Sequence, residues 1–164
     1  MAYQYATQNM TDKMARASRT GLAISTKQSI EIANRIRGKQ TTVAQKYLEE
    51  VISMDRPVKL TRFNWNAGHK PGIGPGRYPV TAAAEFLRLL KLTIANAAHK
   101  SLDTSRLRIF NVVAQRGPKS YKPSRTRGLK SKVTHLEIVL EEFHPKKAAS
   151  KNASAKTAKS AAKQ

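Results

Sequence analysis

The stretch QRGPKSYKPSRTRGLKSK, at residues 115–132, limits the folds open to this chain more than any other part of it. It holds seven Lys or Arg, three Ser, two Gly and two Pro, and no acidic residue. The runs on either side, RLRIFNVVA and VTHLEIVLEE, partly alternate apolar and polar residues, which predicts two antiparallel strands joined by a strongly cationic connection. The apolar positions of the pair are Leu107, Ile109, Val113, Val133, Leu136, Ile138 and Leu140.

The predicted strands and their connection reach beyond what a compact domain covers. Pro123 lies 16 residues after Leu107, a span of about 50 Å when the chain is extended. An isolated hairpin is only marginally stable in water, so order along this arm would come from a partner that surrounds it. Seven cations without an acid favour a polyanionic partner, because each neutralised phosphate releases counterions. A flexible, solvated loop is the simpler alternative and stays open.

The charge of the whole chain supports a polyanionic partner. The 164 residues carry a net charge of +21, and the isoelectric point is near 10.7. So many like charges on one chain repel one another unless a polyanion neutralises them. The excess is concentrated in 115–132 and in the last 20 residues, which are rich in Ala, Lys and Ser and lack the large apolar residues that a packed structure needs.

Several classes of function are disfavoured by what the sequence lacks. There is no cysteine, so disulfides, thiolate metal sites and thiol catalysis are excluded. The carboxylates Glu49, Glu50, Glu141 and Glu142 are adjacent pairs that point in different directions, and no nucleophile motif is present. We therefore expect neither an enzyme nor a cofactor or metal. The four histidines without metal-ligand spacing are His69, His99, His135 and His144.

The chain also lacks the signals of a membrane or exported protein. It has no run of about 18 apolar residues, and its start, MAYQYATQNM, lacks the charged and apolar regions of a signal peptide. We expect a soluble intracellular protein with no membrane partner. The predicted organisation is an extended N-terminal arm at 1–20, a single globular domain at 21–144 that includes a hairpin arm at 107–140, and a disordered basic tail at 145–164. The N-terminal arm is predicted to add a strand around Tyr3 to Thr7.

Three helices are predicted before the strand pair. The first begins at Ser25, with Gln28 as a capping-box partner, and ends at Gly38. The second covers about Thr42 to Ile52, and the third follows Pro79 for about 20 residues. Each has one apolar face to bury. The apolar positions of these faces are Ile30, Ala33, Ile36, Ala44, Tyr47, Leu48, Val51, Ile52, Phe86, Leu87, Leu90, Ile94 and Ala97.

The segment from Arg56 to Tyr78 is rich in Gly, Pro and basic residues and is predicted to be a long loop. Its GIGPG sequence follows neither the dinucleotide-binding nor the P-loop pattern, and Pro75 removes a backbone donor, so a nucleotide site is disfavoured. A basic loop lying against nucleic acid fits better. Arg62, Lys70 and Arg77 would contact phosphates, and Phe63 or Trp65 would stack on bases. An equally favoured alternative is that these two aromatic residues pack on the core and hold the loop in place.

Five stretches of the chain resemble one known family, in the same order, over about residues 20–143. They are ISTKQSIEIANRIRGK (24–39), AQKYLEEVI (44–52), GHKPGIGPGRYPVTAAAEFLRLL (68–90), ANAAHKSLD (95–103) and THLEIVLEE (134–142). These residues look like the L22 family of large-subunit ribosomal proteins. The inserted loop before the third helix, with its GHK and GRYP elements, is similar to archaeal and eukaryotic members.

The resemblance implies an α+β fold, in which three helices pack on a small antiparallel sheet and a long β-hairpin arm protrudes. It implies a structural protein of the cytoplasmic ribosome that binds large-subunit rRNA and supports early subunit assembly. The globular part would lie near the outer opening of the polypeptide exit tunnel, and the hairpin tip would form part of the tunnel wall. The implied partners are large-subunit rRNA, neighbouring ribosomal proteins and the nascent polypeptide.

Family positions and the residue chemistry together give the expected contacts. The tip residues are Lys119, Ser120, Tyr121, Lys122, Pro123, Ser124, Arg125, Thr126, Arg127 and Gly128. The expected rRNA-binding residues are Lys27, Arg35, Arg37, Lys39, Arg62, Lys70, Arg77, Arg116, Lys119, Lys122, Arg125, Arg127, Lys130 and Lys132. The chain departs from the family pattern in three places. Thr26 stands where Pro is usual, the tip reads PSRTRGLK, and the return strand is several residues shorter.

Two other functions remain open from the sequence. The Ala-Lys-Ser tail is also typical of a DNA-compacting chromatin protein, although the long Gly/Pro loop and the hairpin arm argue against that function. A small nucleotide-dependent enzyme would depend on GIGPG alone.

Overall fold

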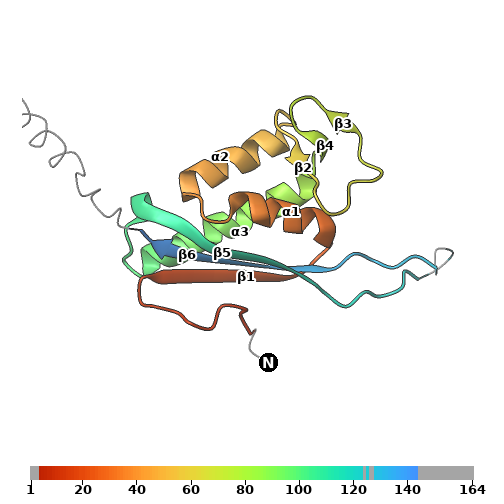
Figure 1. Ribbon diagram of the computed structural model, residues 1–164. Coiled ribbons are helices and arrows are strands. Elements are labelled where there is room, and N and C mark those ends of the chain that lie inside the picture. The colour runs from red at the N-terminus through yellow and green to blue at the C-terminus, as the bar shows by residue number, and fades with distance from the viewer. Residues whose placement is uncertain (1–3, 124, 126–127, 144–164) are drawn as a thin grey trace, which may run out of the picture.

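The structure, a computed structural model, describes residues 4–123, 125 and 128–143. Three helices cover one face of a three-stranded antiparallel sheet, which confirms the predicted α+β fold class (Figure 1). The sheet strands are β1 (Met14–Leu22), β5 (Leu107–Arg116) and β6 (Thr134–Glu142). The helices are α1 (Thr26–Ile36), α2 (Thr41–Ile52) and α3 (Val80–His99), with a short 3-10 helix at Thr104–Arg106.

The helical side of the sheet forms the hydrophobic core. Phe86, Leu89 and Leu90 of α3 are fully buried, and they belong to the same core cluster as Ile138 and Leu140 of β6. The predicted faces of α2 and α3 are confirmed, with Ile52 of α2 and Leu87 and Ile94 of α3 only partly buried. In α1 the buried apolar residues are Ile32, Ala33 and Ile36, whereas the predicted Ile30 is only partly buried.

The start of α1 differs from the predicted capping box. Ser25 does precede the helix, but its side chain makes no capping hydrogen bond. The helix is instead tied to the sheet by Thr134, whose hydroxyl lies 2.7 Å from the hydroxyl of Thr26 and 2.9 Å from the carbonyl oxygen of Ile24. A buried threonine of β6 therefore fixes the place where α1 begins.

The sheet has the order β1-β6-β5, so the last strand of the chain lies between the other two. Ile138 of β6 pairs with Ala17 of β1 on one side and with Val112 of β5 on the other. A bulge between Ile109 and Asn111 shifts the alternation of β5 by one residue. As a result Val112, and not the predicted Val113, is fully buried.

The other face of the sheet is crossed by the N-terminal segment, residues 4–13, which runs back beside the sheet on the side away from the helices (Figure 1). Glu137 of β6 is 1 % exposed, and its carboxylate accepts hydrogen bonds from the backbone N–H groups of Ala6, at 3.0 and 3.1 Å, and Thr7, at 3.4 Å.

The strand predicted around Tyr3 to Thr7 is wrong for the described residues 4–7. The N-terminal strand is β1, so the predicted boundary at residue 20 falls inside a core strand.

The predicted long loop contains a second, small sheet. Its strands are β2 (Val58–Lys59), β3 (His69–Lys70) and β4 (Gly74–Arg77), in the order β2-β4-β3. The turn between β3 and β4 uses Gly72 and Gly74 at positive φ, which glycine adopts without strain. This sheet lies beside the start of α1 and shapes the surface described below (Figure 1).

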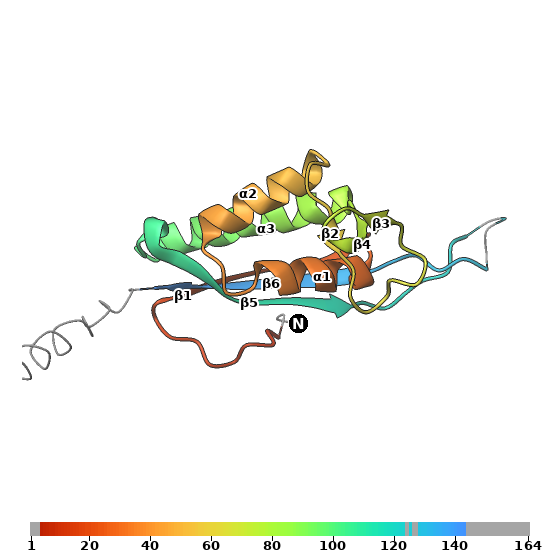
Figure 2. The same ribbon diagram turned by 45° about the horizontal axis from the view of Figure 1, so that its top comes forward.

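Beyond the core sheet, residues 117–123 and 128–133 project away from the body side by side (Figures 1 and 2). Regular pairing ends at Arg116 and Thr134. Further out the backbone hydrogen bonds are Gly117 N–H to the carbonyl of Val133, at 3.0 Å, Ser131 N–H to that of Ser120, at 2.9 Å, and Lys122 N–H to that of Leu129, at 2.9 Å. The predicted protruding hairpin arm at 107–140 is thus not confirmed, because β5 and β6 belong to the sheet of the body.

Some predictions fall on residues outside the described part of the chain. These are the tip residues Ser124, Thr126 and Arg127 and the tail at 145–164. Within the described residues, no helix has both the length and the apolar character needed to cross a bilayer.

The carboxylate of Glu137 should hold the N-terminal segment to the sheet. We predict that Glu137→Ala releases residues 4–13 and lowers the free energy of unfolding by about 2 kcal/mol, as is typical when hydrogen bonds to a charged group are removed. Hydrogen exchange at Ala6 and Thr7 and urea unfolding measure the two effects. Glu49→Ala, on the exposed side of α2, is the control and should change stability by less than about 0.5 kcal/mol. Unchanged protection of Ala6 and Thr7 in Glu137→Ala would contradict this assignment.

Candidate nucleic-acid interface

The structure groups the predicted basic residues in three places. The first group, at the end of α1 beside α2, contains Arg35 and Lys39. The second group lies around the small sheet and contains Lys27, Arg62, Lys70 and Arg77. The third group lies on the projecting segments and at their base, and contains Arg116, Lys119, Lys122, Arg125, Lys130 and Lys132. Arg37 belongs to none of them, because its guanidinium donates to the backbone carbonyl of Val112 at 2.8 Å and joins α1 to β5. Arg127 lies outside the described residues.

The first group surrounds the ring of Tyr47, a buried residue of α2. The cationic ends of Arg35, Lys39 and Arg56 lie 5.9, 5.5 and 5.3 Å from the ring centroid. This is within the range of cation–π attraction. Burial raises the pKa of the Tyr47 phenol, so the ring stays neutral at physiological pH. We call Arg35, Lys39 and Arg56 the Tyr47 cluster.

Lys39 shows the electrostatic state of this cluster. Its pKa is lowered from the ordinary 10.5, first by burial and then by repulsion from Arg35 and Arg56. Glu50 forms an ion pair with Arg56 at 3.1 Å, which offsets part of this repulsion. An anion bound among the three cations would relieve the rest, so the cluster is chemically suited to a phosphate.

Around the small sheet, two side chains hold the loop that carries Phe63 and Trp65. Glu31 of α1, 7 % exposed, accepts hydrogen bonds from the N–H and hydroxyl of Thr61, at 3.0 and 2.9 Å, and from the N–H of Arg62, at 3.1 Å. Arg77 donates to the backbone carbonyl of Asn66 at 2.9 Å and to its side-chain oxygen at 3.3 Å. Residues 61–66 are therefore fixed at both ends.

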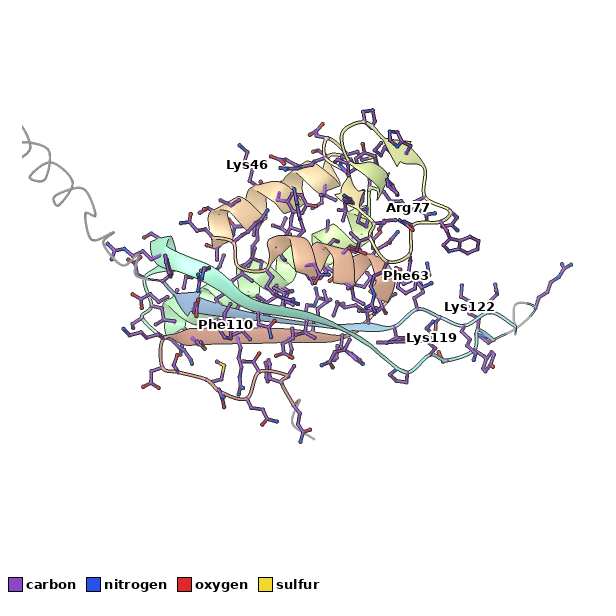
Figure 3. The ribbon with its side chains drawn as sticks, in the orientation of Figure 1. Lys46, Phe63, Arg77, Phe110, Lys119 and Lys122 are labelled. Carbon is purple, nitrogen blue, oxygen red and sulfur yellow. The ribbon has the colours of Figure 1, made fainter. Side chains whose placement is uncertain are left out.

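The aromatic residues of this loop face solvent. Trp65 is 89 % exposed, which contradicts the alternative that it pins the loop to the core, and Phe63 is 43 % exposed. Together with Lys27 and Arg77 they line a cavity of about 220 Å³, in which the Lys27 ammonium lies 4.1 Å from the Phe63 ring centroid. Figure 3 shows Phe63 and Arg77 in this region, between the small sheet and α1.

The projecting segments present their charges to solvent. Lys119 and Lys122 are exposed and lie beyond the end of the core sheet (Figure 3). Lys130 lies over the ring of Tyr121, with its ammonium 4.7 Å from the centroid. At the base of the projection Gly117 is required for space, because a Cβ there would lie 2.5 Å from Val133 Cγ1 and 2.7 Å from His135 Nε2.

The described residues contain no group of three or more His, Asp or Glu side chains placed to hold a metal ion. The three basic groups can instead bind anions, and exposed aromatic rings accompany two of them. This combination suits a nucleic acid, whose phosphates take the charges and whose bases take the rings. Arg56 is the member that the sequence did not predict. Its distance from Tyr47 depends on how the end of α2 turns back, which has no signal in residue type.

The charge of Lys39 should lower the stability of the free protein and raise its affinity for RNA. We predict that Lys39→Met raises the thermal midpoint, because a partly desolvated charge that Arg35 and Arg56 repel is removed. It should also lower RNA affinity and reduce the slope of log K against log salt by about 0.7 to 0.9, the decrease expected for one phosphate contact. Lys46→Met, at an exposed position of α2 (Figure 3), is the matched control. A less stable variant with unchanged RNA affinity would assign Lys39 a structural role instead.

The same residue predicts a pH dependence. Since the folded state lowers the pKa of Lys39, the unfolded chain binds more protons than the folded protein between the lowered value and 10.5. Stability should gain a contribution as pH rises through that window, and Lys39→Met should lack it. Denaturant unfolding of both proteins at several alkaline pH values measures the difference. Parallel pH profiles would contradict the assignment.

Comparison with known proteins gives the relationship of the chain. Residues 17–141 match the family model described as ribosomal protein L22p/L17e. The large ribosomal subunit protein uL22 of Methanocaldococcus jannaschii is 38% identical over 149 residues, which cover 86% of this chain and 96% of the relative. The uL22 protein of Ignicoccus hospitalis is 38% identical over 144 residues, covering 80% and 89%. Both names are those of a protein of the large ribosomal subunit and not of an enzyme, which agrees with the predicted class of protein. The chain belongs to the ribosomal protein L22p/L17e family, and its relatives are of the archaeal type that its sequence resembles.

Proposed function

We propose that this chain is a structural protein of the large ribosomal subunit in the cytoplasm, and that it binds large-subunit rRNA through the three basic groups. The observation that carries the proposal is the Tyr47 cluster, three cations held around one buried ring in a state that an anion would relieve. The names of its relatives give the same assembly. Neighbouring ribosomal proteins are further partners.

Binding through the body is electrostatic and depends on shape. The Tyr47 cluster and the small-sheet group lie on different elements of a rigid body, so each would take a different part of the RNA backbone. RNA helices are recognised mainly by shape and by backbone contacts, which suits cations held at fixed distances. The released counterions supply much of the affinity.

The projecting segments are the part that we place in the exit tunnel. The body would lie near the outer opening, and the tip, Lys119–Gly128, would form part of the tunnel wall beside the nascent polypeptide. Two features support this arrangement. The segments leave the body where regular pairing ends, and their sequence is rich in Lys and Arg and contains no Asp or Glu. Their order would come from rRNA on all sides, and coupled ordering would join distant rRNA segments early in subunit assembly.

The DNA-compacting alternative finds no support in the comparisons. It depended on the tail at 145–164, which lies outside the described residues. The named relatives are ribosomal proteins.

Replacing residues 118–132 by Asn-Gly should test the role of the arm in rRNA binding. Gly117 and Val133 are already paired at 3.0 Å, so a two-residue turn can close the sheet there and leave the body folded. The change removes six Lys or Arg. We predict weaker binding to large-subunit rRNA and a salt slope lower by about 0.7 to 0.9 for each phosphate that the shortened arm no longer neutralises.

Two controls separate charge from shape in this experiment. A variant with the six cations replaced by Gln keeps the length of the arm and should show the same decrease in salt slope. Lys46→Ala removes one exposed cation from α2 (Figure 3) and should change the slope by less than one phosphate contact. An unchanged slope in the shortened arm would refute its role in RNA binding.

The tunnel position is tested separately in ribosomes. A photoreactive residue in place of Lys122 should crosslink to a stalled nascent chain, whereas the same residue in place of Lys46 should not. Crosslinking to rRNA alone from position 122 would place the tip in RNA but away from the tunnel.

A further inference from the structure

The only tryptophan of the chain, Trp65, is also one of its most exposed large apolar side chains. Leaving an indole in water is unfavourable, and a tryptophan that faces solvent from a fixed loop often marks a contact surface. We propose that the cavity beside Trp65 binds one unpaired nucleobase of the RNA, stacked on the indole ring. The inference depends on the proposed function in one respect, that the partner is RNA.

The loop is held in place before any ligand arrives. Its first residues are tied to Glu31 through Thr61 and the N–H of Arg62, and its last is tied to Arg77 through Asn66. The exposure of Trp65 is therefore a property of an ordered segment. A preorganised aromatic ring loses little conformational entropy on binding, which favours its use in recognition.

The cavity has the size and lining for one base. Its volume is about 220 Å³, below the range of roughly 300–1,000 Å³ that drug-sized ligands occupy. Leu60 and Phe63 give it apolar surface, and Ser25, Gln28 and Asn66 give it hydroxyl and amide groups. Such groups can both donate and accept hydrogen bonds, as the edge of a nucleobase requires.

The charges around the cavity select a nucleotide over an apolar peptide. Lys27 lies against Phe63 and lines the cavity, as does Arg77, while Arg62 lies in the same loop with its side chain exposed. Glu31 is the one acidic residue of the lining, and its carboxylate accepts hydrogen bonds from Thr61 and from the N–H of Arg62. A base that enters the cavity carries its own phosphate on each side, and these cations are placed to receive it. Stacking of a single-stranded base on an aromatic ring, with the backbone held by basic residues, is the usual mode of recognition of unpaired RNA.

Because Trp65 is the only tryptophan, its fluorescence reports on this site alone. The full chain is titrated with large-subunit rRNA, with single-stranded oligoadenylate, and with an abasic oligonucleotide of the same length. Filter binding measures RNA association in the same samples. We expect rRNA and oligoadenylate to quench the emission and to protect the indole from acrylamide, and the abasic strand to do neither.

Variants with matched exposure test the pocket without removing the reporter. Phe63 and Phe110 are both 43 % exposed, but Phe110 lies on β5, away from the cavity (Figure 3). Phe63→Ala should weaken binding of oligoadenylate, and Phe110→Ala should leave it unchanged. Trp65→Ala should reduce affinity for oligoadenylate by about 5- to 150-fold, the range that removal of one stacking aromatic gives, and Trp65→Phe should restore part of it.

Three results would overturn the proposed base pocket, and each differs from the result that would overturn the proposed function. Bound rRNA with an unchanged and acrylamide-accessible indole rejects the pocket and leaves rRNA binding intact. Equal quenching by the abasic strand rejects base stacking. If the indole is protected from acrylamide in assembled subunits but accessible when the chain is bound to rRNA alone, the pocket binds a neighbouring protein and not a base. No association with rRNA in the filter assay rejects the proposed function itself.

Discussion

The pairing of β6 with both β1 and β5 is the constraint on which the rest of the structure depends. This strand is buried from Leu136 to Leu140. Leu136, Ile138 and Leu140 belong to the hydrophobic core, and Glu137 on the opposite face holds the N-terminal segment. Its first residue, Thr134, fixes the start of α1, and the chain just before it returns from the projecting segments. The body, the N-terminal segment and the arm are therefore all positioned by one nine-residue strand.

A rigid body allows a strongly charged protein to hold its cations close together. The Tyr47 cluster keeps three cations near one ring, and the cavity beside Trp65 keeps an aromatic ring in water, because both lie on elements anchored by buried contacts. Glu31 shows the principle in one residue. Its carboxylate is 7 % exposed and accepts hydrogen bonds from the backbone of the loop, so one nearly buried acid orders the segment that carries the exposed Arg62 and Trp65.

Much of the fold could be predicted because the three helices and the last two strands have clear apolar periodicity. β1 was missed since MARASRTGL offers only small or charged residues at most positions, and its burial comes from pairing with β6. The bulge at Phe110 and the short strands of the small sheet have no signal in residue type. For the site, residue type alone predicted the basic residues. It could not distinguish Arg37, which binds a backbone carbonyl, from Arg35, which faces the Tyr47 ring.

The central place of β6 has a consequence for synthesis. β1 is made within the first 22 residues, yet its partner ends at residue 142, so the edge of β1 stays unpaired while some 110 residues are added. Contacts between such distant residues form slowly, because a long loop must close before any pairing is gained. The arm is always complete before the sheet that carries it. An RNA that captured the arm during translation would shorten the search of β6 for its two neighbours.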